Sequence, residues 1–120
     1  MTQVAQQPQR QWMYNQRTGQ LRNPDGQLDR ARGYSGVRAF VNNPAAEAMA
    51  FQGPIPRGAY IVGRDTGTRG PRTLVLDPDG HRAHDRTELR IHGDSLEHPG
   101  DASTGCIILN RRQRDAIQQP

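Results

Sequence analysis

Short apolar runs separated by turn-forming residues recur along this chain, and most of them alternate with polar positions as half-buried strands do. Strands are predicted over residues 59–63, 73–76, 89–92 and 106–109, after an opening hairpin within residues 11–21. Glycine, proline, asparagine and aspartate supply turns at 23–26, 33–36, 42–44 and 77–80. The pattern predicts an all-β fold of the sandwich or barrel-like kind.

Only two segments carry helix signals, and both are short. Pro44 follows Asn43, a good N-cap, and predicts one or two helical turns up to residue 50. Asn110 is placed to cap a final helix over residues 111–118. Residues 1–10 are polar and rich in glutamine, which indicates a flexible N-terminal arm before a single domain over residues 11–120.

Charge and composition narrow the class of partner. The net charge is +4 and all 16 basic residues are arginine, which suits recognition of carboxylates and approach to anionic polymers. No arginine run matches a nucleic-acid-binding motif, so we expect no nucleic-acid partner. The chain has neither an apolar signal region nor a stretch that could cross a membrane. We therefore expect synthesis in the cytoplasm without a signal peptide, and no membrane insertion.

The single cysteine, Cys106, follows Ser103, Thr104 and Gly105, and His92 lies 14 positions upstream. The thiol alone favours a buried core residue, because it opens an apolar run. Gly105 favours the other interpretation, since glycine lets the backbone turn sharply and present its N–H groups to an oxyanion. We predict Cys106 as a nucleophile and His92 as the general base that takes its proton.

Supporting roles are predicted for the neighbouring residues, either in binding the oxyanion or in orienting the pair: Ser103, Thr104, Gly105, Gly93 and Asp94. Asp94 shares a strand face with His92 and is a candidate to orient the imidazole. Turn formation by Asp94, and orientation of His92 by a backbone carbonyl, are the alternatives. His81 and His84 have a metal-like spacing, but no cysteine pair or glutamate-bearing helix accompanies them, so no metal and no cofactor is predicted.

Three blocks together carry a family resemblance. They are residues 33–36 with 42–44, residues 53–60, and Ile91-His92-Gly93-Asp94 with Ser103-Thr104-Gly105-Cys106-Ile107. In this order and spacing the chain resembles the type VI secretion L,D-transpeptidase effectors, which are antibacterial toxins among the L,D-transpeptidase-like cysteine enzymes. The combination of blocks is specific, although each block alone is weak.

The resemblance implies an activity on peptidoglycan peptide stems through a Cys106 acyl-enzyme. Such enzymes remove the terminal D-alanine of tetrapeptides, as L,D-carboxypeptidases, or exchange it for another D-amino acid, as L,D-transpeptidases. The resemblance also makes Tyr34, Ser35 and Asn43 candidates to line the substrate cleft, with the shaping of a loop as the alternative role. Arg90 flanks the reactive strand and is a candidate to meet a stem carboxylate.

The resemblance further implies where the protein acts and with what. We expect secretion into the periplasm of a target bacterium, with an immunity protein and a secretion-system component as partners. Two other functions stay open. A phage-type cysteine amidase or peptidase lysin would use the same pair but would not exchange an added D-amino acid into the stem. A non-enzymatic basic binding module would show salt-sensitive binding that survives Cys106→Ala.

Overall fold

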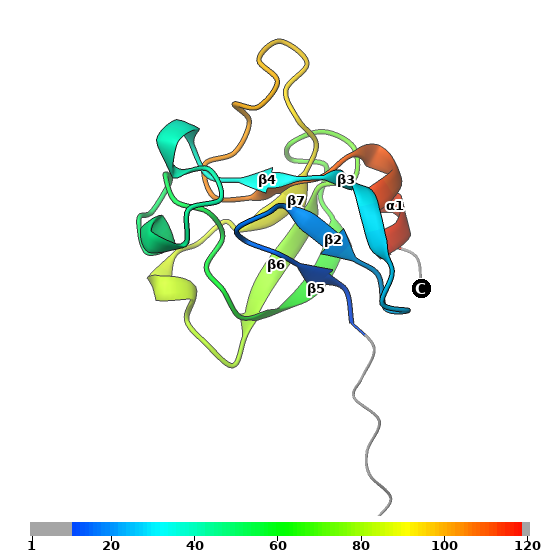
Figure 1. The fold of residues 1–120 in the computed structure, drawn as a ribbon, viewed down its shortest axis with the longest axis horizontal. Helices are drawn as coiled ribbons and strands as arrows, with labels where there is room; N and C mark the ends of the chain where they lie inside the picture. Colours follow the sequence, from blue (N-terminus) through cyan, green and yellow to red (C-terminus); the bar gives the residue numbers. More distant parts are fainter. Residues whose placement is uncertain (1–10, 119–120) are drawn as a thin grey trace, which may run out of the picture.

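The structure is a computed structural model that describes residues 11–118; the predicted arm, residues 1–10, lies outside the described residues. Within the described part, the strands form two sheets, accompanied by one short α-helix and three 3-10 helices (Figure 1). The predicted all-β class with few helices is therefore confirmed.

Two sheets of different size make up the domain. The smaller sheet is antiparallel, with β1 (Met13–Tyr14), β2 (Gln20–Arg22) and β3 (Leu28–Arg32) in chain order. The larger sheet has the order β4-β8-β7-β6-β5, with β4 (Tyr34–Ser35), β5 (Ala59–Asp65), β6 (Leu74–Asp79), β7 (Arg90–His92) and β8 (Ile107–Ile108). Its central strands β7 and β8 run parallel, whereas its other pairs are antiparallel.

Gly33 carries the chain from the first sheet into the second. Its N–H donates to the Gly19 carbonyl at 2.8 Å. A Cβ at position 33 would lie 2.2 Å from the carbonyl oxygen of Ile108, so only glycine fits between the two sheets. The chain turns at Gly33, which is the single residue between β3 and β4 (Figure 1).

The alternation of side chains along β7 and β8 separates the core from the opposite face. Ile91 and Ile107 are paired across the two strands and belong to the apolar cluster. Leu21, from the smaller sheet, belongs to the same cluster, so the core lies between the sheets. His92 on β7 and Cys106 just before β8 alternate with these core residues, and they therefore point to the other face.

The helix α1 (Arg111–Gln118) has the bounds that the sequence predicts, and it packs along β3 (Figure 1). The Gln113 side chain donates to the Ala31 carbonyl at 3.0 Å, and Arg112 makes a two-pronged ion pair with Asp29 at 2.8 and 2.9 Å. No helix within residues 11–118 has the length and apolar character needed to cross a bilayer.

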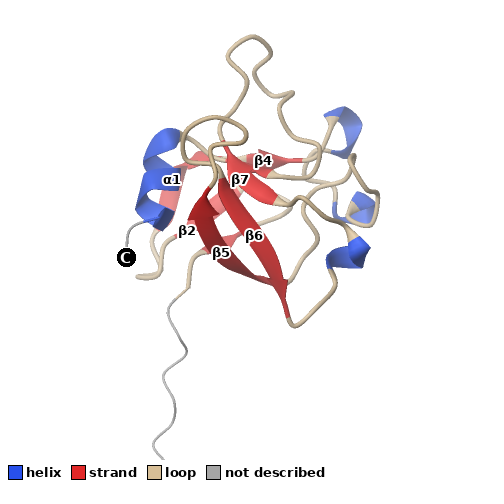
Figure 2. Ribbon diagram, turned by 180° about the vertical axis from the view of Figure 1, so that it is seen from behind, coloured by secondary structure: helices blue, strands red, loops and turns tan. Residues whose placement is uncertain are grey.

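Three 3-10 helices, η1 (Arg38–Phe40), η2 (Pro44–Ala46) and η3 (Ala83–Asp85), lie across the molecule from α1 (Figure 2). The predicted helical turn after Asn43 is confirmed as η2, and the Asn43 side chain caps it by accepting from the Ala45 N–H at 3.0 Å.

Several elements differ from the sequence pattern for identifiable reasons. The pattern does not predict β3, because its residues show no apolar alternation; main-chain pairing with β2 and contacts to α1 hold it instead. A turn is expected from Asp77, but β6 continues through Pro78 to Asp79. β6 pairs with β7 only at Leu74 and Val75. Pro78 lies beyond these positions, where β7 does not need an N–H donor from β6, so a proline is tolerated there. The expected loop at 33–36 contains β4.

Candidate active site

Cys106 and His92 line the same cavity, which has a volume of about 170 Å³. Its wall is formed by residues 50–51, 69, 85–90, 92 and 104–106. Both side chains are buried, with 6% of Cys106 and 4% of His92 exposed. The thiol donates to the Glu88 carbonyl at 3.6 Å, and among residues 11–118 no hydrogen bond joins it directly to the imidazole. The fold thus brings the two predicted reactive groups together at one cavity.

A backbone carbonyl orients the imidazole of His92. Its Nδ1 lies 2.9 Å from the carbonyl oxygen of Gly93. Because a carbonyl oxygen can only accept, Nδ1 carries the proton in this contact, and the lone pair is left on Nε2. The Asp94 carboxylate instead accepts from the Tyr34 hydroxyl at 2.7 Å and from two backbone N–H groups of its own loop. The contacts therefore favour Gly93 over Asp94 as the orienting group.

Two buried serines hold residues 103–106, here called the cysteine turn. The Ser103 hydroxyl accepts from the N–H groups of Gly36 (2.9 Å) and Gly105 (3.1 Å) and donates to the Cys106 carbonyl at 2.6 Å. The Ser35 hydroxyl donates to the Gly105 carbonyl at 3.1 Å. Gly105 has a φ of +129°, in the region that favours glycine, as its place in the sequence predicts. Each residue of this network fixes the backbone that presents the thiol.

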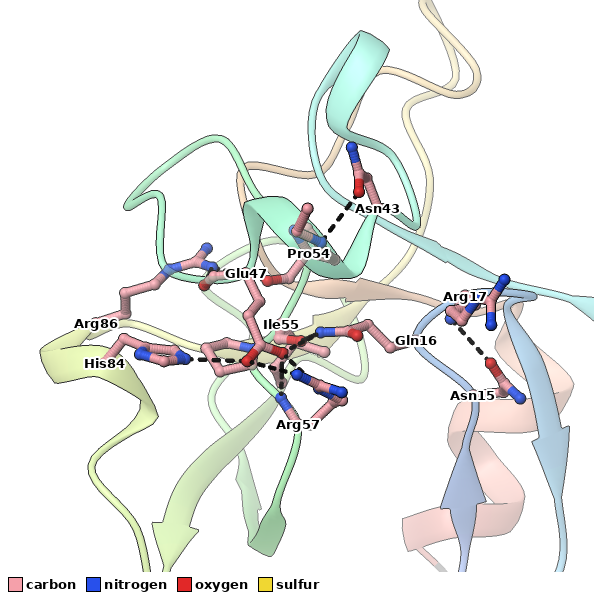
Figure 3. Close-up of polar contacts among 12 residues, drawn as sticks. Asn15, Gln16, Arg17, Asn43, Glu47, Pro54, Ile55, Arg57, His84 and Arg86 are labelled. Atoms are coloured by element: carbon pink, nitrogen blue, oxygen red, sulfur yellow. Dashed lines mark hydrogen bonds and ion pairs between the residues drawn. The ribbon is translucent and has the colours of Figure 1, made fainter.

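Arg86 holds the cysteine turn in place through a contact with its backbone. The sequence pattern does not single out this residue. Its side chain is buried and donates to four backbone carbonyls, those of Glu47, Gly53, Pro54 and Thr104, at distances from 2.7 to 3.5 Å. Figure 3 shows Arg86 beside Glu47 and the polar contacts of the Glu47 side chain. A guanidinium can satisfy several carbonyls at once because it presents five N–H donors in a fixed plane.

The Glu47 carboxylate joins the segments that surround Arg86. It accepts from Gln16 at 2.7 Å, from the Arg57 Nε at 3.0 Å and from the His84 Nε2 at 3.0 Å (Figure 3). Burial acts to raise the pKa of Glu47, but these hydrogen bonds outweigh burial and lower the pKa to about 2. The η2 segment is thereby tied to η3.

Backbone strain accumulates on both sides of Arg86. Ala83, His84 and Asp85 have φ values of 49°, 52° and 59°, and Glu88 has 60°. Non-glycine residues in this region each cost on the order of 1–3 kcal/mol and persist where the surroundings determine them. Here the surroundings are the carbonyls held by Arg86 and the carboxylate of Glu47, which hold the strained segment where it forms part of the cavity wall.

Burial favours a neutral thiol and a neutral imidazole at rest. Burial raises the pKa of the Cys106 thiol, although the Arg90 N–H and the charges of Arg90, Arg69 and Arg86 oppose this. Burial also lowers the pKa of His92, and the Arg69 charge lowers it further, against the hydrogen bond to the neighbouring carbonyl. A neutral imidazole is the form that can accept a proton as the thiol attacks.

The other predicted site residues divide into two groups. Arg90 and Thr104 line the cavity, whereas Tyr34, Ser35 and Asn43 lie outside its wall. Ser35 is 0% exposed and serves the cysteine turn, and Asn43 caps η2.

The Tyr34 hydroxyl fixes the long loop between β7 and β8, which projects from the body of the domain in Figure 1. It donates to Asp94 at 2.7 Å and accepts from the Ala102 N–H at 2.8 Å. Burial and the Asp94 carboxylate raise the pKa of Tyr34 to about 12, so this hydroxyl keeps its proton at neutral pH.

The two histidines with metal-like spacing face separate partners. His81 Nε2 lies 2.8 Å from the Ala59 carbonyl, and His84 pairs with Glu47. Within the described part of the chain, no three histidine, cysteine, aspartate or glutamate residues gather in a way that could hold a metal ion.

Comparison with known families places the site within a matched domain. A family model described as the Tlde1 domain matches residues 29–119. The matched range includes the whole cavity wall and every predicted site residue. Searches of curated proteins and of solved structures gave no match.

Proposed function

The chain belongs to the Tlde1 domain family, and from this premise we propose that it edits peptidoglycan peptide stems through a Cys106 acyl-enzyme. The family is that of the type VI secretion L,D-transpeptidase effectors, which the residue blocks around His92 and Cys106 also resemble. Membership implies an antibacterial effector that acts on peptidoglycan. The finer reaction proposed here is removal of the terminal D-alanine from tetrapeptides, or its exchange for another D-amino acid.

One observation carries the proposal: the only thiol of the chain and a carbonyl-oriented imidazole share one cavity wall. A cysteine that served only as a buried core residue would not explain this arrangement. Two serines and a buried arginine hold the cysteine turn in a strained form that depends on glycine. Strained and closely held backbone is typical of sites where geometry must be exact for chemistry.

The proposed reaction begins with attack of Cys106 Sγ on the carbonyl carbon between the third residue and the terminal D-alanine. The thiol proton passes to His92 Nε2 during attack, since both groups are neutral at rest. The imidazolium then donates this proton to the departing D-alanine amine as the C–N bond breaks. The products of this half-reaction are free D-alanine and a thioester between the tripeptide acyl group and Cys106.

The oxyanion needs donors that are not already engaged. The Gly105 N–H donates to Ser103, so we assign the oxyanion contacts to the N–H groups of Cys106 and Thr104. Arg86 stabilises this turn by donating a hydrogen bond to the Thr104 carbonyl.

The acceptor decides the outcome of the second half-reaction. Water attacking the thioester gives the tripeptide and a carboxypeptidase reaction, whereas the amine of a D-amino acid gives an exchanged tetrapeptide. In both cases His92 removes a proton from the attacking group and the Cys106 thiol is restored. Depletion of tetrapeptides would remove the donors that wall cross-linking needs.

Family membership also bears on partners and location. Type VI effectors are delivered into target cells and are paired with immunity proteins, so we propose periplasmic action and a neutralising partner for this chain. A partner that binds the protein without inhibiting it would not be the immunity protein proposed here.

The proposal is tested by profiling purified muropeptides after incubation with the wild type, with Cys106→Ala and with Arg64→Gln as an exposed control. We expect tetrapeptides to become tripeptides, or exchanged tetrapeptides when a D-amino acid is added, with the wild type and the control only. Cleavage of a different bond without exchange would indicate the lysin alternative. An unchanged profile with folded wild type would exclude the proposal.

A further inference from the structure

Three arginines line the cavity, and two of them are engaged by the protein itself. Arg86 donates to four backbone carbonyls. Arg90 donates to the Glu88 carbonyl at 3.4 Å, and its Nη2 lies 3.8 Å from the Glu88 carboxylate. Arg69 differs from both, because its side chain is exposed and its guanidinium has no hydrogen-bond or ion-pair partner among residues 11–118.

The backbone that carries Arg69 is nevertheless firmly held. The Asp65 carboxylate accepts from the N–H groups of Gly67, Arg72 and Thr73 at 3.0 to 3.1 Å. The Thr73 hydroxyl accepts from the Arg69 N–H at 3.1 Å and donates to the Gly70 carbonyl at 2.7 Å. The loop between β5 and β6 therefore presents a free guanidinium from a fixed backbone, which reduces the entropy lost when a ligand binds.

The charge of Arg69 acts on both reactive groups, since it lowers the pKa of His92 and the pKa of Cys106. No acidic group of the cavity wall is left to neutralise it. Asp85 pairs with Arg82 at 2.6 Å, and Glu88 is the partner of Arg90. The cavity thus carries an uncompensated cation near the thiol and the imidazole.

We propose that Arg69 is a specificity-determining residue that binds a substrate carboxylate next to the scissile bond. This inference rests on the proposed function, because a peptide stem of the proposed kind carries such a carboxylate on either side of that bond. One is the terminal carboxylate of D-alanine, and the other is the side-chain carboxylate of the third residue, in stems where that residue is a diamino acid with a second carboxyl group. A guanidinium binds a carboxylate through two parallel hydrogen bonds, and no acidic side chain among residues 11–118 occupies this geometry at Arg69.

The test compares Arg69→Gln with Arg64→Gln, which removes an exposed charge from β5 outside the cavity wall. Each is assayed on three synthetic tetrapeptide stems: unmodified, with the terminal carboxylate amidated, and with the side-chain carboxylate amidated. We expect Arg69→Gln to raise KM for the unmodified stem by roughly 10- to 100-fold, with a smaller change in kcat. Arg64→Gln should leave KM unchanged.

The amidated stems identify which carboxylate Arg69 holds. The wild type should lose affinity for one amidated stem by a factor similar to that of the substitution, and Arg69→Gln should not distinguish that stem from the unmodified one. If Arg69→Gln leaves KM unchanged for all stems while the wild type converts them, the inference is overturned and the proposed function stands. The same holds if the substitution raises KM equally for every stem.

A second measurement does not depend on peptidoglycan activity. Cys106 is alkylated with iodoacetate, which carries a carboxylate, and with neutral iodoacetamide, at equal pH and low ionic strength. We expect the iodoacetate rate divided by the iodoacetamide rate to fall roughly fivefold in Arg69→Gln and to stay constant in Arg64→Gln. An unchanged ratio in Arg69→Gln would overturn the carboxylate site even if stems are converted. A protein inactive on stems whose ratio still falls would keep the carboxylate site and remove the proposed function.

Discussion

The guanidinium of Arg86 occupies the space that any side chain at position 105 would need: a Cβ on Gly105 would lie 2.0 Å from Arg86 Nη2. The residue before the thiol and the buried arginine are therefore mutually dependent. Gly105 gives the arginine room to reach the Thr104 carbonyl, and the arginine holds the turn that presents Cys106.

Substitution of Gly105 by alanine should damage both stability and activity. The new methyl group would meet Arg86, and the backbone at φ +129° would be strained. We expect the free energy of unfolding to fall by roughly 2–5 kcal/mol, as overpacking adds to strain. Denaturant titration measures this. Gly100→Ala is the matched control, because Gly100 also has a positive φ, +87°, but an added Cβ meets nothing within 4 Å. Equal losses in the two variants would contradict the contact described here.

Arg86→Lys keeps the positive charge but removes the fork that reaches several carbonyls. Because at least two buried carbonyls lose their donor, we expect a loss of about 2–4 kcal/mol in the free energy of unfolding. We also expect kcat to fall by at least about tenfold, since the cysteine turn loses its support. Arg82→Lys, at an exposed position, should change neither quantity. Wild-type kcat in Arg86→Lys would show that the turn holds its shape without the arginine.

Some of this architecture could be predicted from the sequence. The final helix follows directly from the Asn110 cap, and β7 follows from the alternation that ends in His92. The pair Cys106 and His92 could be singled out because one thiol and a glycine stand in a recognisable order. Both side chains lie on the cavity wall, although their catalytic roles stay predictions.

Other features could not be predicted, because local sequence does not record them. Burial makes Arg86 different from the other arginines, and burial depends on contacts with residues 32 to 39 positions away. β3 carries no apolar alternation, so only its pairing partner and α1 reveal it. Ser35 resembles a cleft residue in sequence, but its hydroxyl reaches a carbonyl 70 residues away in the cysteine turn.

The pH dependence of thiol alkylation reports the resting protonation state of the pair. Burial raises the pKa of Cys106 above its ordinary value of 9.0 and lowers the pKa of His92 below 6.5. The thiol is therefore protonated at neutral pH, and the iodoacetamide rate should still be rising at pH 9. Alkylation reactions quenched at set times and analysed by mass spectrometry give the alkylation rate as a function of pH. A plateau reached below pH 7 would indicate a preformed thiolate–imidazolium pair and contradict the neutral pair.

Acid stability should depend on Glu47. Its pKa of about 2 lies below the ordinary 4.5, so the stabilisation is complete above pH 4.5 and is lost as the pH falls toward 2. Glu47→Gln should cost on the order of 1–3 kcal/mol at pH 7, because a charged acceptor of several hydrogen bonds is removed. The difference from the wild type should shrink between pH 4.5 and 2.

Thermal unfolding across this pH range checks the dependence on Glu47. Glu97→Gln serves as a control on an exposed loop. A difference between Glu47→Gln and the wild type that is constant from pH 7 to 2 would mean that the carboxylate charge does not hold η2 to η3.

The central claim is that Cys106 carries the acyl group of the stem, and intact-protein mass spectrometry tests it most directly. The protein is mixed with excess tetrapeptide stem, quenched in acid at short times, and mapped by proteolysis. We predict a transient mass increase equal to the stem minus D-alanine, located on Cys106, absent from Cys106→Ala and formed far more slowly by His92→Ala. An adduct on any other residue, or stem conversion by Cys106→Ala at the wild-type rate, would contradict the account.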